Sequence, residues 1–293
     1  MVSRITLESD WLCSTAAAEG EGNACITRHY KAMTYNSQLI EKDNDVELNN
    51  KVVLITGGAK RVGASICRLL HSAGANVMIH YRQSKSEAEQ LAAELNQQRP
   101  NSAAIICADL NQIEEVTTLA SGTLKHFGQV DVLINNASSY YATKLGEIDE
   151  QAWQELMGSN LKAPLFLAQA LADELRKRRG CIINIADMHV EKPKKNYIVY
   201  SLAKAGLITL TKSLARELAP QVRVNTVAPG PIMWPENNPD FDANYKQKVI
   251  SETLLNTIGA PEDIAKAVKF LICDAPFITG QLIPVDGGRS LNI

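Results

Sequence analysis

The sequence lacks an excess of charge of either sign, and it lacks any long hydrophobic run. Its 293 residues carry 30 basic and 32 acidic side chains, a formal net charge of −2. A protein that coats nucleic acid or an anionic membrane surface needs a clustered basic excess, so this balance argues against both partners. No stretch of 18 or more apolar residues occurs, so we expect no helix that crosses a membrane.

Metal-binding signatures are also missing. The six cysteines form no CxxC pair and have no histidine at zinc spacing, so we predict no bound metal. Four of them lie inside apolar runs such as 105–107 and 181–183, where a reduced thiol behaves as a small hydrophobic side chain. This pattern favours the reducing cytoplasm as the place where the protein works.

The first fifty residues differ in composition from the remainder. They hold four basic and eight acidic side chains, a net charge of −4, and show no sustained hydrophobic period. Without an uninterrupted apolar segment they are unlike a secretory signal, and their acidic residues argue against a transit peptide. We therefore predict a disordered N-terminal extension over residues 1–49, with Met33 as an alternative start, followed by one domain over residues 50–293.

From residue 51 onward, short apolar runs alternate with longer segments in which apolar residues recur every three or four positions. The runs predict seven strands, at Val52–Thr56, Asn76–Tyr81, Ala103–Ala108, Val130–Asn135, Cys181–Ile185, Arg223–Val227 and Gln281–Val285. Strands this apolar, separated by helices, indicate a parallel sheet covered on both faces. The predicted fold class is α/β: a single doubly wound Rossmann-type domain with a seven-stranded parallel sheet, favoured over two domains.

A glycine-rich turn follows the first predicted strand and precedes a helical pattern. It reads Thr56-Gly57-Gly58-Ala59-Lys60-Arg61-Val62-Gly63. Glycines at such a turn let the backbone approach a pyrophosphate at the positive end of the helix. The strand before it and the helix after it favour a dinucleotide site over a simple turn. Arg61 stands where the common fingerprint has its middle glycine, and it adds a cation beside the phosphates.

The end of the second predicted strand indicates which dinucleotide binds. An NAD site usually holds an acidic residue there for the ribose hydroxyls, whereas an NADP site needs cations and hydroxyls for the 2′-phosphate. The sequence reads His80-Tyr81-Arg82-Gln83-Ser84 and has no acid. With Lys60 and Arg61 expected nearby, NADPH is the predicted cofactor. The alternative, a solvated loop followed by a helix cap, leaves the missing acid unexplained.

Tyr200 and Lys204 lie four residues apart and so share one face of a predicted helix. A phenol with a pKa of about 10 is a slow acid–base group at neutral pH, and an adjacent ammonium is expected to lower that pKa towards the working range. The pair could then move a proton at a reducible C=O or C=N bond. Such pairs are common on solvated helix faces, so this one gains weight only from the nucleotide-binding turn in the same domain.

Together these motifs resemble the short-chain dehydrogenase/reductase family over residues 51–293. The resemblance also includes Asp109-Leu110 after the third strand, Asn135-Asn136-Ala137 after the fourth, Asn160, Pro229-Gly230, Thr279-Gly280-Gln281 and Asp286-Gly287-Gly288. It implies that Asp109 lies near the adenine, that Lys204 holds the nicotinamide ribose and that Asn160 supports a water beside the lysine. The cofactor-binding residues expected in this way are Gly57, Lys60, Arg61, Val62, Tyr81, Arg82, Ser84, Asp109, Leu110, Asn136, Ala137, Ser138, Tyr200, Lys204, Pro229 and Gly230.

Two departures from the general family pattern are similar to its pteridine reductase branch. Asp187 replaces the serine that usually polarises a carbonyl, and Arg61 replaces a glycine of the phosphate turn. The similarity extends to Asn136-Ala137-Ser138-Ser139-Tyr140, to His80-Tyr81 with Ser84, and to residues 99–103. In that branch an aromatic residue occupies the position of Tyr140, which could stack on the pterin. A half-buried loop aromatic for Tyr140 and a strand-end cap for Asp187 are the plainer alternatives.

The resemblance implies an enzyme in which NADPH reduces a pterin C=N bond, with dihydropterin giving tetrahydropterin and oxidised pterins or folates as further substrates. The expected catalytic residues are Asp187, Tyr200, Lys204 and Asn160, and the expected substrate residues are Arg61, Ser138, Tyr140, Asp187 and Tyr200. Two alternatives stay open: a general NADPH-dependent ketoreductase, for example of 3-oxoacyl thioesters, and a non-catalytic NADP-binding sensor. Asp187 counts against the first, and the presence of Tyr200 and Lys204 counts against the second.

Two expectations concern the remainder of the chain. The segment 231–251, rich in proline, asparagine and aspartate, is expected to form a mobile lid that sets specificity. The family resemblance also implies a homotetramer that assembles through long helices at 151–175 and 197–218.

Overall fold

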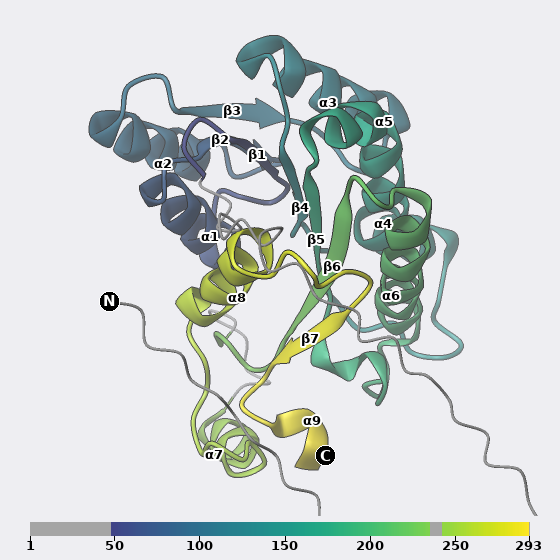
Figure 1. The fold of residues 1–293 in the computed structure, drawn as a ribbon. Helices are drawn as coiled ribbons and strands as arrows, with labels where there is room; N and C mark the ends of the chain where they lie inside the picture. The colour runs from purple at the N-terminus through teal and green to yellow at the C-terminus, as the bar shows by residue number, and fades with distance from the viewer. Residues whose placement is uncertain (1–47, 235–241, 293) are drawn as a thin grey trace, which may run out of the picture. The chain divides into compact units, whose positions relative to one another are not determined.

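Seven parallel strands form one sheet at the centre of the structure (Figure 1). In this computed structural model the described residues are 48–234 and 242–292. Neighbouring strands follow the order β3-β2-β1-β4-β5-β6-β7, and each pair is parallel. The strands are β1 Val52–Ile55, β2 Asn76–Tyr81, β3 Ala103–Cys107, β4 Val132–Asn135, β5 Cys181–Ile185, β6 Arg223–Pro229 and β7 Leu282–Val285. The predicted class and sheet are confirmed, with every predicted strand end within two residues of the observed one.

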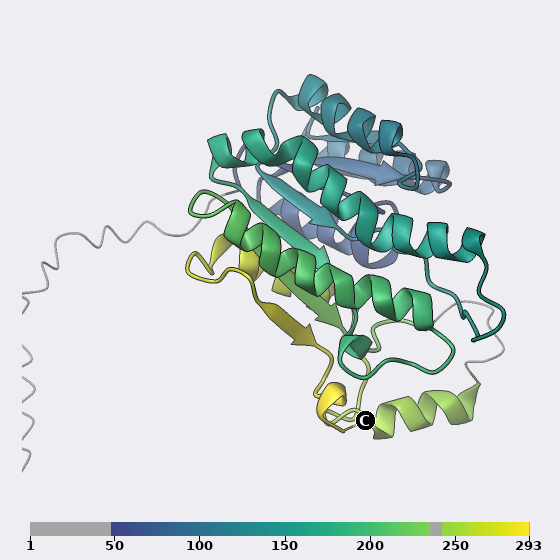
Figure 2. The same ribbon diagram turned by 90° about the vertical axis from the view of Figure 1, so that its right-hand side faces the viewer.

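Alternate side chains of the strands face two separate hydrophobic cores. In β1, Val53 and Ile55 belong to one buried cluster and Leu54 to the other, as the two-residue period of a strand requires. The helices of the first cluster are α1 Arg61–Ser72, α2 Lys85–Gln98 and α8 Pro261–Cys273, and those of the second are α3 Ile113–Phe127, α5 Ala163–Arg178 and α6 Ile198–Glu217. Figure 1 shows one helical layer on either side of the sheet, and Figure 2 shows α5 and α6 running side by side across it. This two-sided cover explains why the strands are uniformly apolar.

The helix expected from 151 to 175 is interrupted, which corrects that prediction. Helix α4 covers Glu150–Met157, one turn of wider π-helix covers Gly158–Lys162, and α5 follows directly. Pro164, near the start of α5, has no N–H to donate to the preceding turn, and the wider turn closes instead from the Ala163 N–H to the Gly158 carbonyl. Such turns are frequent at functional sites, and this one contains Asn160.

The expected lid is partly helical. Helix α7 covers Ala243–Ser251, and Asp242 caps it by accepting a hydrogen bond of 2.7 Å from the Tyr245 N–H. Residues 235–241 of that segment lie outside the described residues, as does the predicted extension apart from its last two positions. A short 3-10 turn at Met188–Val190 and helix α9, Arg289–Asn292, complete the elements used below. In the described part of the chain, no helix has the length and apolarity needed to cross a membrane.

The sheet reverses its strand order between β1 and β4. From β1 the chain continues towards β2 and β3 on one side, whereas β4 leads to β5, β6 and β7 on the other. In open parallel sheets, ligands bind beyond the carboxyl ends of the strands at such a reversal. The segments that follow β1, β4, β5 and β6 all reach this edge, and they carry most of the residues that the sequence analysis singled out.

Candidate active site

Two adjoining cavities, of about 480 and 390 Å³, lie at the carboxyl ends of the strands. The larger is lined by the turn after β1, and the smaller contains Asp187, Tyr200 and Lys204. Arg61 and Asn136 line both, so the two cavities share a wall. A third cavity of about 210 Å³ includes the end of β2. Every residue predicted to bind the cofactor lines at least one of these three cavities.

The glycines of the turn after β1 are required by close backbone approach. Gly57 has a positive φ of +60°, and a Cβ there would lie 2.9 Å from the Cα of Ala137. A Cβ at Gly63 would overlap the Gly57 carbonyl oxygen and lie 2.8 Å from the Asn136 Nδ2. The Asn136 amide in turn donates to the Gly57 carbonyl at 2.9 Å. The turn is therefore packed against the segment after β4, with no room for larger residues.

Arg61 has a left-handed backbone conformation. This conformation favours glycine, which explains why the common fingerprint has a glycine at this position. Its φ of +52° costs an L-residue about 1 kcal/mol relative to an ordinary helical conformation. The side chain is exposed and lines both main cavities. The predicted position between a cofactor phosphate and the substrate is thus compatible with where Arg61 lies.

The start of α1 suits an anionic group. Its first turn contains no acidic residue, and Lys60, the residue before the helix, makes no side-chain cap. The positive end of the helix adjoins the large cavity, whose lining includes Arg61, Val62 and Gly63. A cradle of close-packed glycines at an uncapped helix start fits the pyrophosphate of a dinucleotide.

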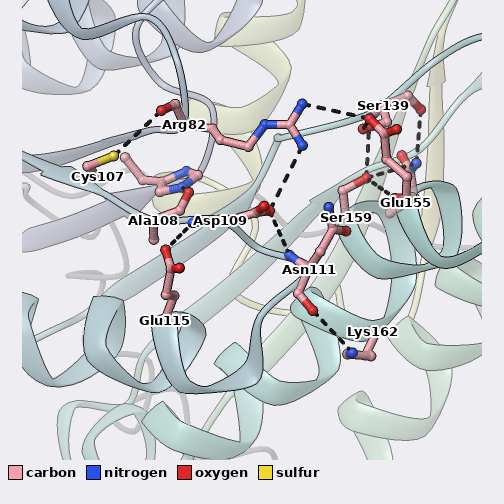
Figure 3. A network of polar contacts seen from close by, with 12 residues as sticks. Arg82, Cys107, Ala108, Asp109, Asn111, Glu115, Ser139, Glu155, Ser159 and Lys162 are labelled. Atoms are coloured by element: carbon pink, nitrogen blue, oxygen red, sulfur yellow. Dashed lines mark hydrogen bonds and ion pairs between the residues drawn. The ribbon is translucent and has the colours of Figure 1, made fainter. Parts of the chain in front are cut away.

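Arg82 is held by two acidic residues that the sequence did not place beside it. Its guanidinium lies 3.9 Å from Asp109 and 3.7 Å from Glu155, as Figure 3 shows. All three side chains are about one-third or more exposed, so each ion pair contributes at most about 1 kcal/mol. The two carboxylates come from the segment after β3 and from α4. Ser84 makes no side-chain cap to α2, and it lines the third cavity together with Arg82.

Asp187, Tyr200 and Lys204 meet in the smaller cavity. The Tyr200 hydroxyl donates to the Asp187 carboxylate at 2.8 Å. Lys204 Nζ, which is buried, donates to the carbonyl oxygen of Ile185 at 2.9 Å and lies 5.8 Å from the centre of the Tyr200 ring. Burial lowers the pKa of Lys204 to about 8, against the opposing effect of Asp187. Asp187 also accepts a hydrogen bond from the His189 N–H at 2.8 Å, so it caps the 3-10 turn that follows β5.

The expected lowering of the Tyr200 pKa is not what this arrangement produces. Burial and the negative charge of Asp187 raise the pKa of the Tyr200 phenol well above its usual value. Lys204 Nζ donates to a backbone carbonyl and not to the phenol, so no hydrogen bond from the ammonium opposes these two effects. The Tyr200 phenol is therefore protonated at neutral pH.

Asn160 acts on the loop after β4. Its Oδ1 accepts from the Ser138 hydroxyl at 2.7 Å, and its Nδ2 donates to the carbonyl oxygens of Ser139 and Leu156 at 3.0 and 2.9 Å. The side chain is only 1% exposed and lines neither main cavity. The π-helical turn therefore presents Asn160 to the loop that carries Ser138, and its expected part in catalysis stays a prediction.

Tyr140 lines the smaller cavity as part of an aromatic cluster. Its ring stacks on Tyr197 at 4.8 Å and meets Tyr200 edge-on at 4.9 Å. Lys194 donates to the Tyr140 hydroxyl at 3.0 Å and lies 4.5 Å above the centre of the Tyr197 ring. Tyr140 is 44% exposed, so its contacts with Tyr197 and Tyr200 leave part of the side chain accessible. Its predicted stacking on a substrate stays a prediction.

Three residues of the site were not identified as parts of it in the sequence analysis. Tyr197, which immediately precedes α6, could have been found from its spacing of three residues before Tyr200. Glu155 gave no such signal, because its contact with Arg82 depends on how separate elements pack. His80 was noted only as part of a resemblance, although it is buried in the wall of the large cavity. Among the described residues, no group of three metal-ligating side chains is found.

A doubly wound sheet with a glycine turn at the strand reversal and a buried Tyr–Lys pair defines a dinucleotide-dependent oxidoreductase. A family model described as enoyl-(acyl carrier protein) reductase matches residues 57–290. Pteridine reductase 1 of Leishmania tarentolae is 38% identical over 282 residues, covering 82% of this chain and 96% of the relative. The chain belongs to the short-chain dehydrogenase/reductase family.

Relatives named for other substrates are similar to a comparable degree. A 3-oxoacyl-(acyl-carrier-protein) reductase of Staphylococcus epidermidis is 37% identical over 242 residues, covering 82% of this chain and 98% of the relative. The 3beta-hydroxysteroid dehydrogenase 1 of Eggerthella lenta is 33% identical over 251 residues, covering 84% of this chain and 95% of the relative. Sequence identity therefore assigns the family but does not choose the substrate.

Proposed function

We propose that this protein is an NADPH-dependent reductase of pterins that converts dihydropterins to tetrahydropterins. The observation that carries the proposal is the hydrogen bond of 2.8 Å from the Tyr200 hydroxyl to Asp187. A carboxylate here can accept hydrogen bonds from the amino and ring N–H groups of a pterin edge, whereas a ketone offers only an acceptor oxygen. A carboxylate beside a ketone oxygen would be unfavourable, which is why Asp187 favours a nitrogen heterocycle.

Binding of NADPH is proposed in the large and third cavities. The pyrophosphate would lie at the turn Gly57–Gly63, the adenine near Asp109 and Leu110, and the 2′-phosphate by Lys60, Arg82 and Ser84. Lys204 and the backbone at Pro229–Gly230 would hold the nicotinamide end, where the two main cavities meet. Bound NADPH would supply a hydride at that place.

The residues of this chain would supply the proton. Reduction adds a hydride to the carbon of a C=N bond and a proton to its nitrogen, so that NADPH becomes NADP⁺. Tyr200 is a protonated donor already hydrogen-bonded to Asp187, and Asp187 can hold the substrate edge while the proton moves. Lys204, with a pKa brought to about 8 by burial, is able to return a proton to this pair near neutral pH.

A second candidate function is reduction of 3-oxoacyl thioesters. It is favoured by the 37% identity to the Staphylococcus epidermidis reductase, which is close to the 38% of the pteridine reductase. Against it stands Asp187, because stabilising a developing alkoxide needs a hydrogen-bond donor and a carboxylate has none when ionised. A non-catalytic NADP sensor is the third reading, and the intact arrangement of Tyr200 and Lys204 argues against it.

An assay of NADPH oxidation against a panel of substrates tests these three functions. The panel comprises dihydrobiopterin, dihydromonapterin, dihydrofolate, biopterin and a 3-oxoacyl thioester, each with the full chain. We expect turnover of at least one dihydropterin with a higher kcat/KM than the thioester. Turnover of the thioester alone would replace the proposal by the second candidate. Tight NADPH binding with no turnover of any substrate would favour the sensor.

We also propose that the protein assembles as a homotetramer, with one interface on α4, α5 and α6. Four large apolar side chains on these helices are more than one-third exposed in the single chain, namely Trp153, Leu165, Ile198 and Leu202. Burying them against a second copy would remove this apolar surface from water. Light scattering in solution should give about four times 32.0 kDa, and a monomer mass would contradict the proposal.

We propose that the protein works in a reducing compartment such as the cytoplasm, because thiols that the structure describes are reduced and partly buried. Cys67, Cys107 and Cys181 form no disulfide, and Cys67 and Cys181 are buried. Burial raises the pKa of the Cys181 thiol to about 11, so it is unreactive and serves as a packing residue.

A further inference from the structure

His80 joins two segments that line the large cavity. It lies in β2, only 2% of its surface is exposed, and it forms part of the cavity wall. Its Nδ1 is 3.0 Å from the backbone nitrogen of Gly57, in the turn after β1. Its Nε2 is 3.0 Å from the carbonyl oxygen of Ala108, immediately before Asp109. The imidazole thus spans from the expected phosphate turn to the expected adenine segment.

These two hydrogen bonds fix the protonation state of the ring. A backbone N–H can only donate, so Nδ1 must carry a lone pair towards Gly57. A backbone carbonyl can only accept, so Nε2 must carry the hydrogen that points to Ala108. His80 is therefore a neutral imidazole with its hydrogen on Nε2, and a second proton would have to go on Nδ1, against the Gly57 N–H.

The same residue holds the next amide of the turn as well. The backbone carbonyl of His80 accepts a hydrogen bond of 3.0 Å from the Gly58 N–H. Gly57 has a positive φ of +60°, and its carbonyl accepts from the Asn136 amide at 2.9 Å. Both amides of the glycine pair are thus held by His80, one by the side chain and one by the backbone. The path of the turn into α1 depends on this residue.

We propose that His80 is a positioning residue for the dinucleotide, and that cofactor binding requires its imidazole to be neutral. Protonation of Nδ1 would remove the acceptor for the Gly57 N–H and set two N–H groups against each other. The turn would then have to move, and with it the start of α1 and the Gly57–Gly63 cradle. Acidification should therefore weaken cofactor binding through one group, independently of which substrate the enzyme reduces.

The surroundings of the ring support a neutral state at physiological pH. Burial lowers the pKa of His80 below its usual value, while the Ala108 carbonyl and Asp109 act in the opposite direction and Arg82 adds to the lowering. Lys60 and Arg61 line the same cavity from the start of α1, and a bound pyrophosphate would lie near them. A dianionic ligand would favour a protonated histidine electrostatically, so weaker binding in acid would be a specific sign of the lost hydrogen bond.

Two substitutions of His80 distinguish the loss of its hydrogen bond with Gly57 from the protonation of its ring. In His80→Asn the side-chain oxygen takes about the place of Nδ1 and can accept from Gly57, but it does not titrate. His80→Leu fills the space without any acceptor. The dissociation constant of NADP⁺, which is stable in acid, would be measured by calorimetry from pH 8 to pH 5 with the full chain. Any protonation of NADP⁺ itself in this pH range affects wild type and variants alike, so it cancels when they are compared.

We expect wild type and His80→Asn to bind within about threefold of each other at pH 8, and His80→Leu to bind about tenfold more weakly, the loss expected for one hydrogen bond. As the pH falls from 8 to 5, the wild-type affinity should fall more steeply than that of His80→Asn, because only the wild-type ring can take up a proton. The proposal is overturned if His80→Leu binds like wild type at pH 8, or if the wild-type pH profile matches that of His80→Asn.

His71 offers a matched control for stability. It is also buried, at 3% exposure, and its Nε2 is 2.6 Å from the Ser102 hydroxyl, but it lines none of the three cavities at the site. His71→Leu should lower the melting temperature to an extent similar to His80→Leu while leaving the NADP⁺ dissociation constant unchanged. Equal losses of affinity in the two leucine variants would mean that buried histidines act only through global stability, and would contradict the proposal.

Discussion

The Tyr200 hydroxyl donates a hydrogen bond of 2.8 Å to the carboxylate of Asp187. Asp187 is the residue that replaces the serine of the general family pattern. A serine hydroxyl can donate to a substrate oxygen, whereas an ionised carboxylate only accepts. The exchange therefore changes what the site can hold next to the tyrosine: the carboxylate suits N–H groups, and the serine suits a carbonyl. We therefore expect this one position to influence the substrate class more than the overall identity to any relative does.

Changing Asp187 should consequently change the substrate preference. Asp187→Asn keeps the size but removes the charge, and Asp187→Ser restores the family hydroxyl. Both are expected to lower kcat/KM for a dihydropterin by about a hundredfold or more, the usual size of a lost acid–base partner. Only Asp187→Ser should gain activity on a 3-oxoacyl thioester, measured by NADPH oxidation. Unchanged pterin reduction in both variants would show that the carboxylate does not meet the substrate.

Tyr200→Phe removes the only atom of that side chain that could deliver a proton. We expect kcat to fall by 10²- to 10⁴-fold while the NADPH dissociation constant stays within about twofold, because the ring and its packing against Tyr140 are kept. Single-turnover kinetics separates the chemical step from product release. Near wild-type reduction of dihydropterins by Tyr200→Phe would rule out the proposed proton donor.

The sheet could be predicted from the sequence because its strands are covered on both faces. Each strand is therefore a continuous apolar run that can be recognised without tertiary information. The sequence could also place Tyr200, Lys204 and Asp187 at one edge, since these follow from strand ends and a helical spacing. The contact of Arg82 with Glu155 could not be predicted in this way, because it joins β2 to a helix over seventy residues away. The π-helical turn and the raised pKa of Tyr200 likewise depend on packing and burial rather than on spacing.

The buried lysine should make stability depend on pH in a defined window. The pKa of Lys204 is about 8 in the folded protein and 10.5 when unperturbed, so between these values the unfolded chain binds more protons. Stability contributed by this group therefore rises with pH from about 8 to 10.5, by up to about 3 kcal/mol. Lys204→Met, which cannot titrate, isolates the effect: its advantage over wild type in free energy of unfolding should shrink by that amount between pH 7.5 and 10.5. Denaturant titration measures it, and a constant difference would contradict the burial of an ammonium group.

Arg82 provides the test of cofactor choice, because it is held only loosely by Asp109 and Glu155 at 3.9 and 3.7 Å. A 2′-phosphate carries more charge than either carboxylate and can displace them. Arg82→Ala should therefore weaken NADPH binding about tenfold and NADH binding less than threefold, and the difference should diminish at high salt because the site is exposed. Arg176→Ala, which removes a half-exposed arginine paired with Asp173 elsewhere on the surface, should change neither dissociation constant. If Arg82→Ala weakened both cofactors equally, the guanidinium would contact the part they share, and the preference for NADPH would have to come from Lys60 and Ser84.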